Sequence, residues 1–225
     1  MRARVSAVFV AVMLLGGCAV ASGPTSRTPA PEQTRREPGP TRTSVDPAQA
    51  ERLQRVMIPL IRSMNNPRPL NQVRVGILDT DTINAASAGG AEFYVTRGLL
   101  QKANDRQLMG VLAHEIAHDD LNHVARAQAV GAGLNIGIII LDQIIPGSGA
   151  ITPIAGELIA RGYSRSEEYA ADRHGVELLR RTGQPKDVMI DTLNWLVQTS
   201  GSGSGGFFST HPAGTERVEA LQKLP

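Results

Sequence analysis

Two histidines four residues apart, His114 and His118, constrain this chain more than any other feature of its sequence. On a helix, residues at this spacing differ by about 40° in direction and about 6 Å in height, so both imidazoles leave the same face. Such a pair can bind one Zn²⁺ ion, and Glu115 can act as general base toward a water molecule. Histidines that face solvent or pack in a core are the alternative, so a third ligand must be sought elsewhere.

The residues directly after this motif do not supply the third ligand. The metzincin pattern needs Gly at position 121 and His at position 124, but the chain has Leu121 and Val124 there, which excludes that class. His123 comes nine residues after His114 and points to the opposite side of a continuous helix. We therefore expect His123 to be bonded into the surface or the packing.

A second helix, expected over about residues 164–181, carries Glu168 and Asp172 four residues apart and therefore on one face. Glu168 can complete a His₂Glu site for one zinc ion per chain, with the fourth position open to water. Asp172 can accept the other N–H of a ligand histidine and fix its tautomer. Glu167 is the rival ligand, although Ala171 offers it no such support. An exposed acidic helix start without metal is the remaining alternative.

The order of hydrophobic patterns predicts an α+β domain, mainly helical, with a small β-sheet beside the helix that carries the two histidines. The apolar run at 136–145 is too short for a membrane span and is interrupted by Asp142, so a buried helix or the wall of a cleft is expected there. Expected helices cover 47–64, 97–103, 104 to about 131, about 164–181, about 186–199 and a last segment with Val218 and Leu221; expected strands are 71–79, the residues before Gly89, and Glu92 to Thr96.

The N-terminus predicts export. Residues 1–17 have two arginines, an apolar run and then small residues, as in a secretory signal peptide. The stretch LLGGC resembles the lipobox of bacterial lipoproteins, in which Cys18, the only cysteine, would receive the lipids. A short transmembrane anchor or an uncut signal is the alternative. Residues 18–46 are rich in Pro, Ser, Thr and Arg and are expected to form a disordered tether, followed by the folded domain at 47–225.

The charge balance removes the argument for a nucleic-acid partner, and none is expected. Cleavage before Cys18 removes Arg2 and Arg4 from the 23 basic residues, which leaves 21 against 21 acidic ones. Residue 19 is Ala rather than Asp. For a lipoprotein, this implies the outer membrane, facing the periplasm, in a host with two membranes. In a host with one membrane, the protein would be anchored on the outer face of the cytoplasmic membrane.

Three motifs in order resemble the gluzincin family of HtpX and the type I CaaX prenyl protease, and especially its secreted bacterial branch of the BepA and LoiP type. The resemblance covers about residues 50–225 and implies a zincin-type fold. The matching motifs are His114-Glu-Ile-Ala-His118, then Ser164-Arg165 with Glu168 and Ala171-Asp172, then Ser209-Thr210-His211-Pro212 with Arg217. The resemblance implies that His114, His118 and Glu168 hold zinc. It also implies that Glu115 is the base and that Asp172 supports a ligand histidine.

The resemblance alone assigns roles to His211 and Arg217. It implies that His211 either stabilises the tetrahedral intermediate or blocks the open zinc position in a resting state, and that Arg217 braces this region. A helix-capping residue before Pro212 is the alternative for His211.

The segment over the cleft departs from the family pattern. The family often has Asn-Ala-Phe-Ala before Pro-Gly-Gly, whereas residues 84–90 read NAASAGG. The strand edge can still take an extended peptide by main-chain hydrogen bonds. We expect the peptide to lie along the next strand, Glu92 to Thr96, with Glu92, Phe93, Tyr94 and Val95 as the substrate strand.

Two functions follow from these patterns. The first is a zinc endopeptidase that cleaves misfolded or unassembled cell-envelope proteins near the membrane. The second is a chaperone-like assembly factor that binds extended segments and keeps the metal mainly for structure. The intact set of catalytic-type residues favours the peptidase. The sequence does not predict an oligomeric state.

Overall fold

The computed structural model describes residues 46–123, 138–140, 162–200, 206–212 and 214–225. These residues belong to one unit that spans 42–225. The expected signal peptide, Cys18, nearly all of the expected tether and the Gly-rich residues 201–205 lie outside the described residues. Within the described part of the chain, no helix combines the length and the apolar character that crossing a membrane requires.

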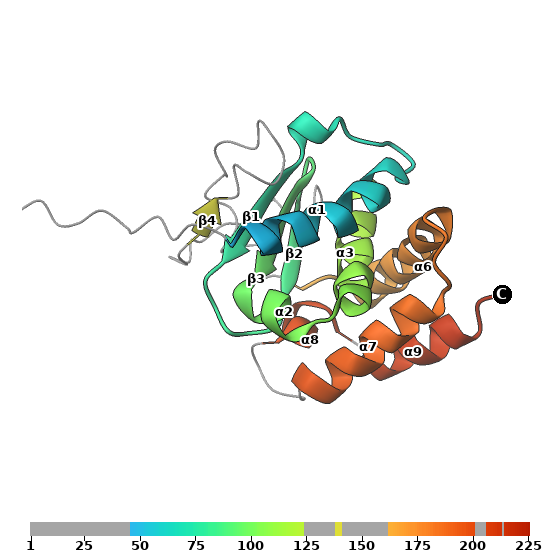
Figure 1. Ribbon diagram of the computed structural model, residues 1–225. Helices are drawn as coiled ribbons and strands as arrows, with labels where there is room; N and C mark the ends of the chain where they lie inside the picture. The colour runs from blue at the N-terminus through green and yellow to red at the C-terminus, as the bar shows by residue number, and fades with distance from the viewer. Residues whose placement is uncertain (1–45, 124–137, 141–161, 201–205, 213) are drawn as a thin grey trace, which may run out of the picture. The chain divides into compact units, whose positions relative to one another are not determined.

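A small mixed sheet forms one side of the domain (Figure 1). Its strand order is β2-β3-β1-β4, in which β1 and β3 are parallel and the other pairs antiparallel. A tight turn joins β2 to β3 through Gly89, Gly90 and Ala91, which all have positive φ angles of 80°, 61° and 65°. The strands are β1 Arg74–Leu78, β2 Ala85–Gly89, β3 Glu92–Thr96 and β4 Ile138–Ile140.

The strand order corrects the expected position of the substrate. β3 pairs with β1 on one side and with β2 on the other, so its main chain has no free edge to accept a peptide. The assignment of Glu92, Phe93, Tyr94 and Val95 as the substrate strand is therefore wrong. Among the described strands, β2 is the edge strand on this side of the sheet.

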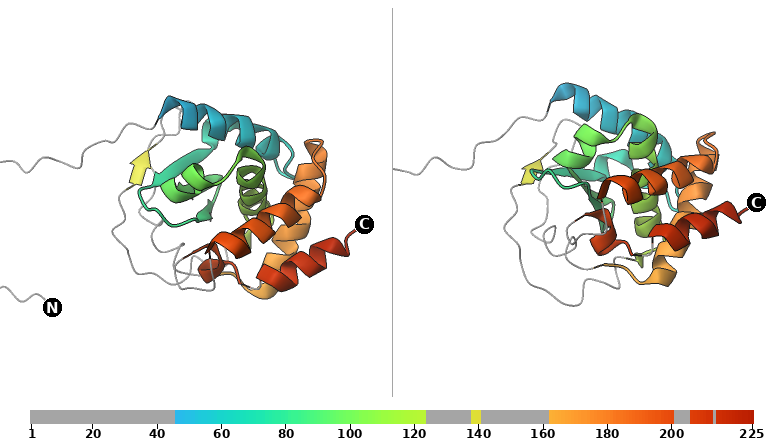
Figure 2. Two further views of the ribbon diagram at one scale, coloured as in Figure 1. Left: turned by 60° about the horizontal axis from the view of Figure 1, so that its bottom comes forward. Right: turned by 90° about the horizontal axis from the view of Figure 1, so that it is seen from below.

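Helix α3, Asp105–Asp120, lies between the sheet and the later helices (Figures 1 and 2). It packs against α1 and β2 on one side and against α6 and α7 on the other, so most of its residues are buried. The mainly helical α+β prediction, with a sheet beside this helix, is confirmed. The other helices are α1 Pro47–Arg62, the 3₁₀ helix η1 Leu70–Gln72, α2 Arg97–Lys102, α6 Arg165–Arg181, α7 Asp187–Ser200, α8 Phe207–Thr210 and α9 Gly214–Gln222.

Capping boxes set the start of the two helices that matter most for the site. Asn104 accepts from the Gln107 N–H at 2.9 Å at the start of α3, and the Gln107 side chain accepts from the Asn104 N–H. Ser164 and Glu167 make the same exchange at the start of α6. Each box satisfies two N–H groups that the first turn leaves unpaired, which fixes the helix register.

Three local features differ from what the sequence predicts. The helix expected to run to about residue 131 ends at Asp120, because Asn122 adopts a left-handed conformation with φ 55° and turns the chain. Ile138–Ile140 form a strand rather than part of the buried helix that was one of the two expectations for 136–145; the other, an apolar wall of a cleft, stays a prediction. Phe207–Thr210 form a short helix, although the surrounding stretch SGSGSGGFFSTHP has the composition of a flexible loop.

Close contact between α3 and α6 depends on Gly175. A Cβ atom at this position would lie 3.3 Å from the carbonyl oxygen of Ala113 on α3 and 2.6 Å from the Met189 side chain of α7. Ala113 is the residue before His114. The absence of a side chain at Gly175 therefore sets how closely the helix of Glu168 approaches the helix of His114 and His118.

We predict that Gly175→Val lowers the free energy of unfolding by about 1–3 kcal/mol, because its methyl groups would force α6 away from α3. Urea denaturation of the metal-free protein measures this change. Arg173→Val is the matched control, because it places the same β-branched residue on an exposed position of α6. Equal stability of Gly175→Val and wild type would show that the helices do not need this close approach.

Candidate metal centre

Four buried side chains meet between α3, α6 and the segment after α8. One ligand atom from each of His114, His118, Glu168 and His211 lies within 4.8 Å of all the others. None of the four residues is more than 1% exposed. The structure therefore brings the three sequence-predicted ligands together, and His211 joins the same group.

The distances within this group suit a metal ion. His118 Nε2 lies 3.0 Å from His114 Nε2 and 3.3 Å from Glu168 Oε1, and His114 Nε2 lies 3.4 Å from Glu168 Oε2. Donor atoms that surround a tetrahedral ion at 2.0–2.1 Å are about 3.3–3.4 Å from one another. The buried His/Glu group can bind a metal ion with little rearrangement.

Charge in the group is balanced by neighbours rather than by solvent. Burial opposes ionisation of Glu168, but His211, His114 and Arg217 outweigh it and hold its pKa well below the usual value. Burial and Arg217 disfavour the charged form of His114, yet Glu168 and Asp172 raise its pKa to about 9. Burial and the nearby His114 lower the pKa of His118 well below its ordinary value. Glu168 and His118 are thus ready to donate electron pairs, whereas His114 must first lose a proton.

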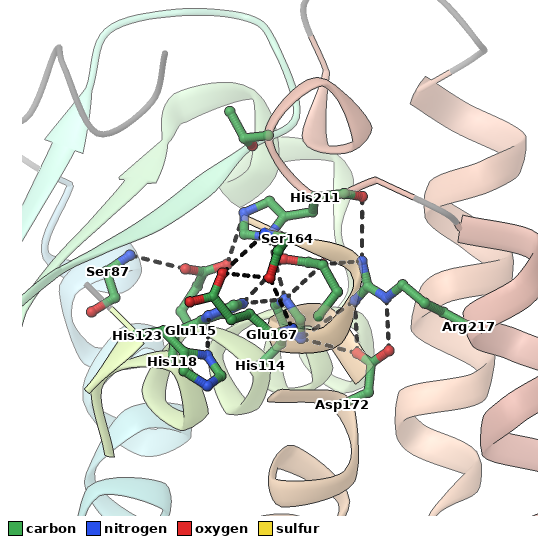
Figure 3. A network of polar contacts seen from close by, with 12 residues as sticks. Ser87, His114, Glu115, His118, His123, Ser164, Glu167, Asp172, His211 and Arg217 are labelled. Atoms are coloured by element: carbon green, nitrogen blue, oxygen red, sulfur yellow. Dashed lines mark hydrogen bonds and ion pairs between the residues drawn. The ribbon is translucent and has the colours of Figure 1, made fainter. Parts of the chain in front are cut away.

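Asp172 and Arg217 form an outer layer around the ligands (Figure 3). Asp172 Oδ1 lies 3.0 Å from His114 Nδ1, the position that the sequence predicted for a supporting carboxylate. Arg217, which is 0% exposed, donates from Nε and Nη2 to the two oxygens of Asp172 at 2.7 Å each. Its Nη1 group contacts Glu168 and donates to the His211 carbonyl oxygen at 3.3 Å. Arg217 therefore links α9 to the ligand helix α6 and to the His211 segment.

The carboxylate of Glu115 lies between the ligand group and the edge strand. Its Oε2 accepts from the Ser87 N–H of β2 at 2.9 Å. Its Oε1 is buried, has no hydrogen bond to any described residue and lies 3.4 Å from His211 Nε2. A buried carboxylate oxygen without a donor is costly, so this atom is suited to a water molecule next to a metal ion.

Asp119 anchors the other end of the edge strand, which the sequence interpretation missed. Its carboxylate accepts from the Ala91 N–H at 3.3 and 3.4 Å, in the turn that follows β2. Burial raises the pKa of Asp119, although the Ala91 N–H group and Arg68 favour its charged form. Glu115 and Asp119 are four residues apart, so one face of α3 holds both β2 and its turn. The sequence did contain a signal for this role. Each of the two histidines is followed directly by an acidic residue, Glu115 or Asp119.

Two aromatic side chains stack on histidines of this group, and the sequence interpretation missed both. Tyr163 stacks on the His118 ring with centroids 3.7 Å apart and an interplanar angle of 21°. Phe207 stacks on His211 at 4.2 Å and 13°. The Tyr163 N–H donates to the Thr210 carbonyl oxygen at 2.9 Å, which ties the start of α6 to the His211 segment.

Two other sequence-based expectations have definite outcomes. Glu167 serves the capping box of α6, since its Oε2 accepts from the Ser164 N–H at 3.0 Å, and it is not part of the ligand group. His123 does not point away from the motif. Its Nδ1 lies 2.9 Å from His118 Nδ1, because the chain turns at Asn122 instead of continuing the helix.

A buried His/Glu group with a carboxylate beside it and an adjacent edge strand has the parts that a metallopeptidase needs. The profile of peptidase family M48 matches residues 47–225, and the chain belongs to that family.

Relatives of known sequence agree with this assignment. A protease HtpX homologue of Methylibium petroleiphilum is 27% identical over 211 aligned residues, which cover 73% of this chain and 73% of the relative. Protease HtpX homologues of Burkholderia mallei and Burkholderia pseudomallei are 28% identical over 224 aligned residues, with 80% of this chain and 76% of the relative covered.

We predict that Glu168→Gln abolishes stable metal binding, whereas Glu167→Gln retains it. The amide is a poor metal ligand, and only Glu168 belongs to the buried group. The metal content of purified protein after dialysis, measured by atomic emission, tests the pair. Equal metal content in Glu168→Gln and wild type would contradict the ligand assignment.

We predict that zinc affinity rises with pH. The pKa of His114 is about 9, so below pH 9 its ring in the metal-free protein is the imidazolium cation, with a proton on both nitrogen atoms. Zinc must displace one of these protons. The apparent Kd should therefore fall about tenfold for each pH unit between pH 6 and 8. Competition with a chelator of known pH dependence measures this slope, and an apparent Kd that is constant over this range would contradict it.

Proposed function

We propose that the protein is a zinc-dependent endopeptidase that cleaves misfolded or unassembled proteins of the cell envelope. One observation supports this most strongly: the Ser87 N–H of the edge strand β2 donates to Glu115, 2.9 Å away, beside the ligand group. A candidate base, a candidate metal site and a strand edge therefore lie close together, which supports a role in peptide hydrolysis.

In this proposal His114, His118 and Glu168 hold one zinc ion per chain. Two imidazoles and a carboxylate are ligands that zinc prefers, and their spacing matches tetrahedral coordination. When bound, zinc would polarise the scissile carbonyl group and lower the pKa of a water molecule to about 7.

An extended peptide would add to β2 rather than to β3. The Ser87 N–H is directed away from β3, because it donates to Glu115 on α3. A peptide along this edge would therefore pass the Glu115 carboxylate. Ser87 holds Oε2, which leaves Oε1 to take a proton from the attacking water and pass it to the leaving amine.

The position of His211 supports the second of its two suggested roles. Its Nδ1 lies 3.0 Å from Glu168 Oε1 and 3.3 Å from His114 Nε2, within the candidate ligand group rather than beside it. In this arrangement His211 would occupy the fourth position and exclude water. Activity would then require the segment after α8 to move away from the ligands.

The cellular setting is also part of the proposal. We infer a lipoprotein of the BepA and LoiP type, anchored to the membrane through Cys18. The support is the LLGGC stretch after an apolar N-terminal run and the Pro-rich segment that follows. An envelope lipoprotein would meet unfolded or misassembled proteins as substrates.

We predict that the zinc-loaded protein cleaves an unfolded test protein and that Glu115→Gln loses at least 100-fold in rate while it keeps its zinc, because only the base is removed. Glu219→Gln is the matched control, an identical change at an exposed position of α9. Gel analysis of cleavage and metal content measure the two effects. Equal cleavage by wild type and Glu115→Gln would refute the role of Glu115.

If the wild type binds zinc without cleavage, His211→Ala separates two explanations. A blocking His211 predicts that this variant gains activity, because the fourth position opens. A variant that binds zinc and remains inactive would instead favour the chaperone-like function, in which extended segments bind along β2 without hydrolysis.

A further inference from the structure

The turn after α3 brings a fourth histidine, His123, to the site. The Leu121 N–H donates to the Ala117 carbonyl oxygen at 3.0 Å and the Asn122 N–H to the Asp119 carbonyl oxygen at 3.0 Å, so the helix closes there. Asn122 then adopts a left-handed conformation with φ 55°. On a continuous helix His123 would be rotated by about 140° from His118. The turn instead places His123 Nδ1 2.9 Å from His118 Nδ1 (Figure 3).

Only one proton can lie between these two nitrogen atoms. If it belongs to His118 Nδ1, then neutral His118 has a bare Nε2, which faces His114 Nε2 at 3.0 Å and Glu168 Oε1 at 3.3 Å. If it belongs to His123 Nδ1, then neutral His118 carries its proton on Nε2 and has no electron pair for a metal ion. Neutral His118 can therefore bind a metal through Nε2 only if its proton is on Nδ1. In that tautomer His118 donates this hydrogen bond and His123 Nδ1 accepts it.

The two ligand histidines have equivalent outer contacts from different parts of the chain. His114 Nδ1 is 3.0 Å from a carboxylate oxygen of Asp172 on α6. His118 Nδ1 meets an imidazole nitrogen of His123, whose ring is nearly perpendicular at 69° and is 7% exposed. Tyr163 stacks on the face of the His118 ring, which still allows the ring to rotate in its own plane. The contact between the two Nδ1 atoms fixes this rotation.

We propose that His123 is a positioning residue for His118: it accepts the Nδ1–H of His118, fixes the orientation of that ring and keeps its Nε2 electron pair available for the metal ion. This role rests on the zinc site proposed above. His123 itself does not touch the metal or the substrate. Its Nδ1 must be unprotonated and its own proton must be on Nε2.

Two substitutions separate the acceptor from the packing. His123→Asn keeps an acceptor oxygen close to the position of Nδ1 but loses most of the ring. His123→Phe keeps the ring volume and loses the acceptor. If His123 only fills space, Phe should replace it better than Asn, whereas an acceptor role predicts the opposite order.

The readout is the Zn²⁺ dissociation constant of the full chain, measured by competition with a chromogenic chelator. We expect His123→Phe to bind zinc about 10–100-fold more weakly than wild type, and His123→Asn to remain within about threefold. Urea denaturation of each metal-free variant shows whether it is folded. If His123→Phe does not fold, His123→Asn still decides the question, because a folded Asn variant with tenfold weaker binding would overturn the proposal.

The outcomes also separate this proposal from the proposed function. A wild type that binds zinc, together with a His123→Phe variant of equal affinity, would overturn the role of His123 and leave the zinc peptidase intact. A wild type that binds no zinc would overturn both. Weaker binding by Phe and near-normal binding by Asn would support the acceptor role.

Discussion

The burial of Glu168 is the constraint on which the rest of the site depends. A carboxylate that is 0% exposed is stable only if positive or donating groups surround it. Histidines from α3 and from the segment after α8 supply part of this environment, and Arg217 on α9 supplies the rest. Three elements outside α6 must therefore be in place before this group can remain ionised. The packing of α9 and of the His211 segment is thus tied to the charge of Glu168.

Helix α3 carries both the two candidate histidine ligands and the two acidic residues that hold the edge strand. Its 114/118 pair faces α6 and the candidate metal position, whereas its 115/119 pair holds β2 and the turn that follows it. Both pairs have the spacing of about one helical turn, so the two faces are displaced by a single residue. The distance between a metal ion and a peptide on β2 would then be set by the geometry of one helix rather than by loops.

Local periodicity explains what the sequence could predict. The pairing of His114 with His118, and of Glu168 with Asp172, needs only the helical repeat, and the structure places each pair on one face. Strand order is a tertiary property, so the interior position of β3 could not be obtained from its residues. The contact of His123 with His118 was missed because it depends on one left-handed residue, Asn122, that ends a helix whose apolar pattern continues.

The edge strand β2 consists entirely of small residues, Ala85-Ala86-Ser87-Ala88-Gly89. The N–H groups of Ala85, Ser87 and Gly89 donate to side chains of this chain. A peptide beside β2 would find few side-chain contacts that distinguish one sequence from another. In the proposed peptidase, selection would then depend on whether a segment of a client protein is extended and detached from its own fold. Such an enzyme would sense the conformational state of a chain rather than its identity, and native neighbours would be spared because their strands are already paired.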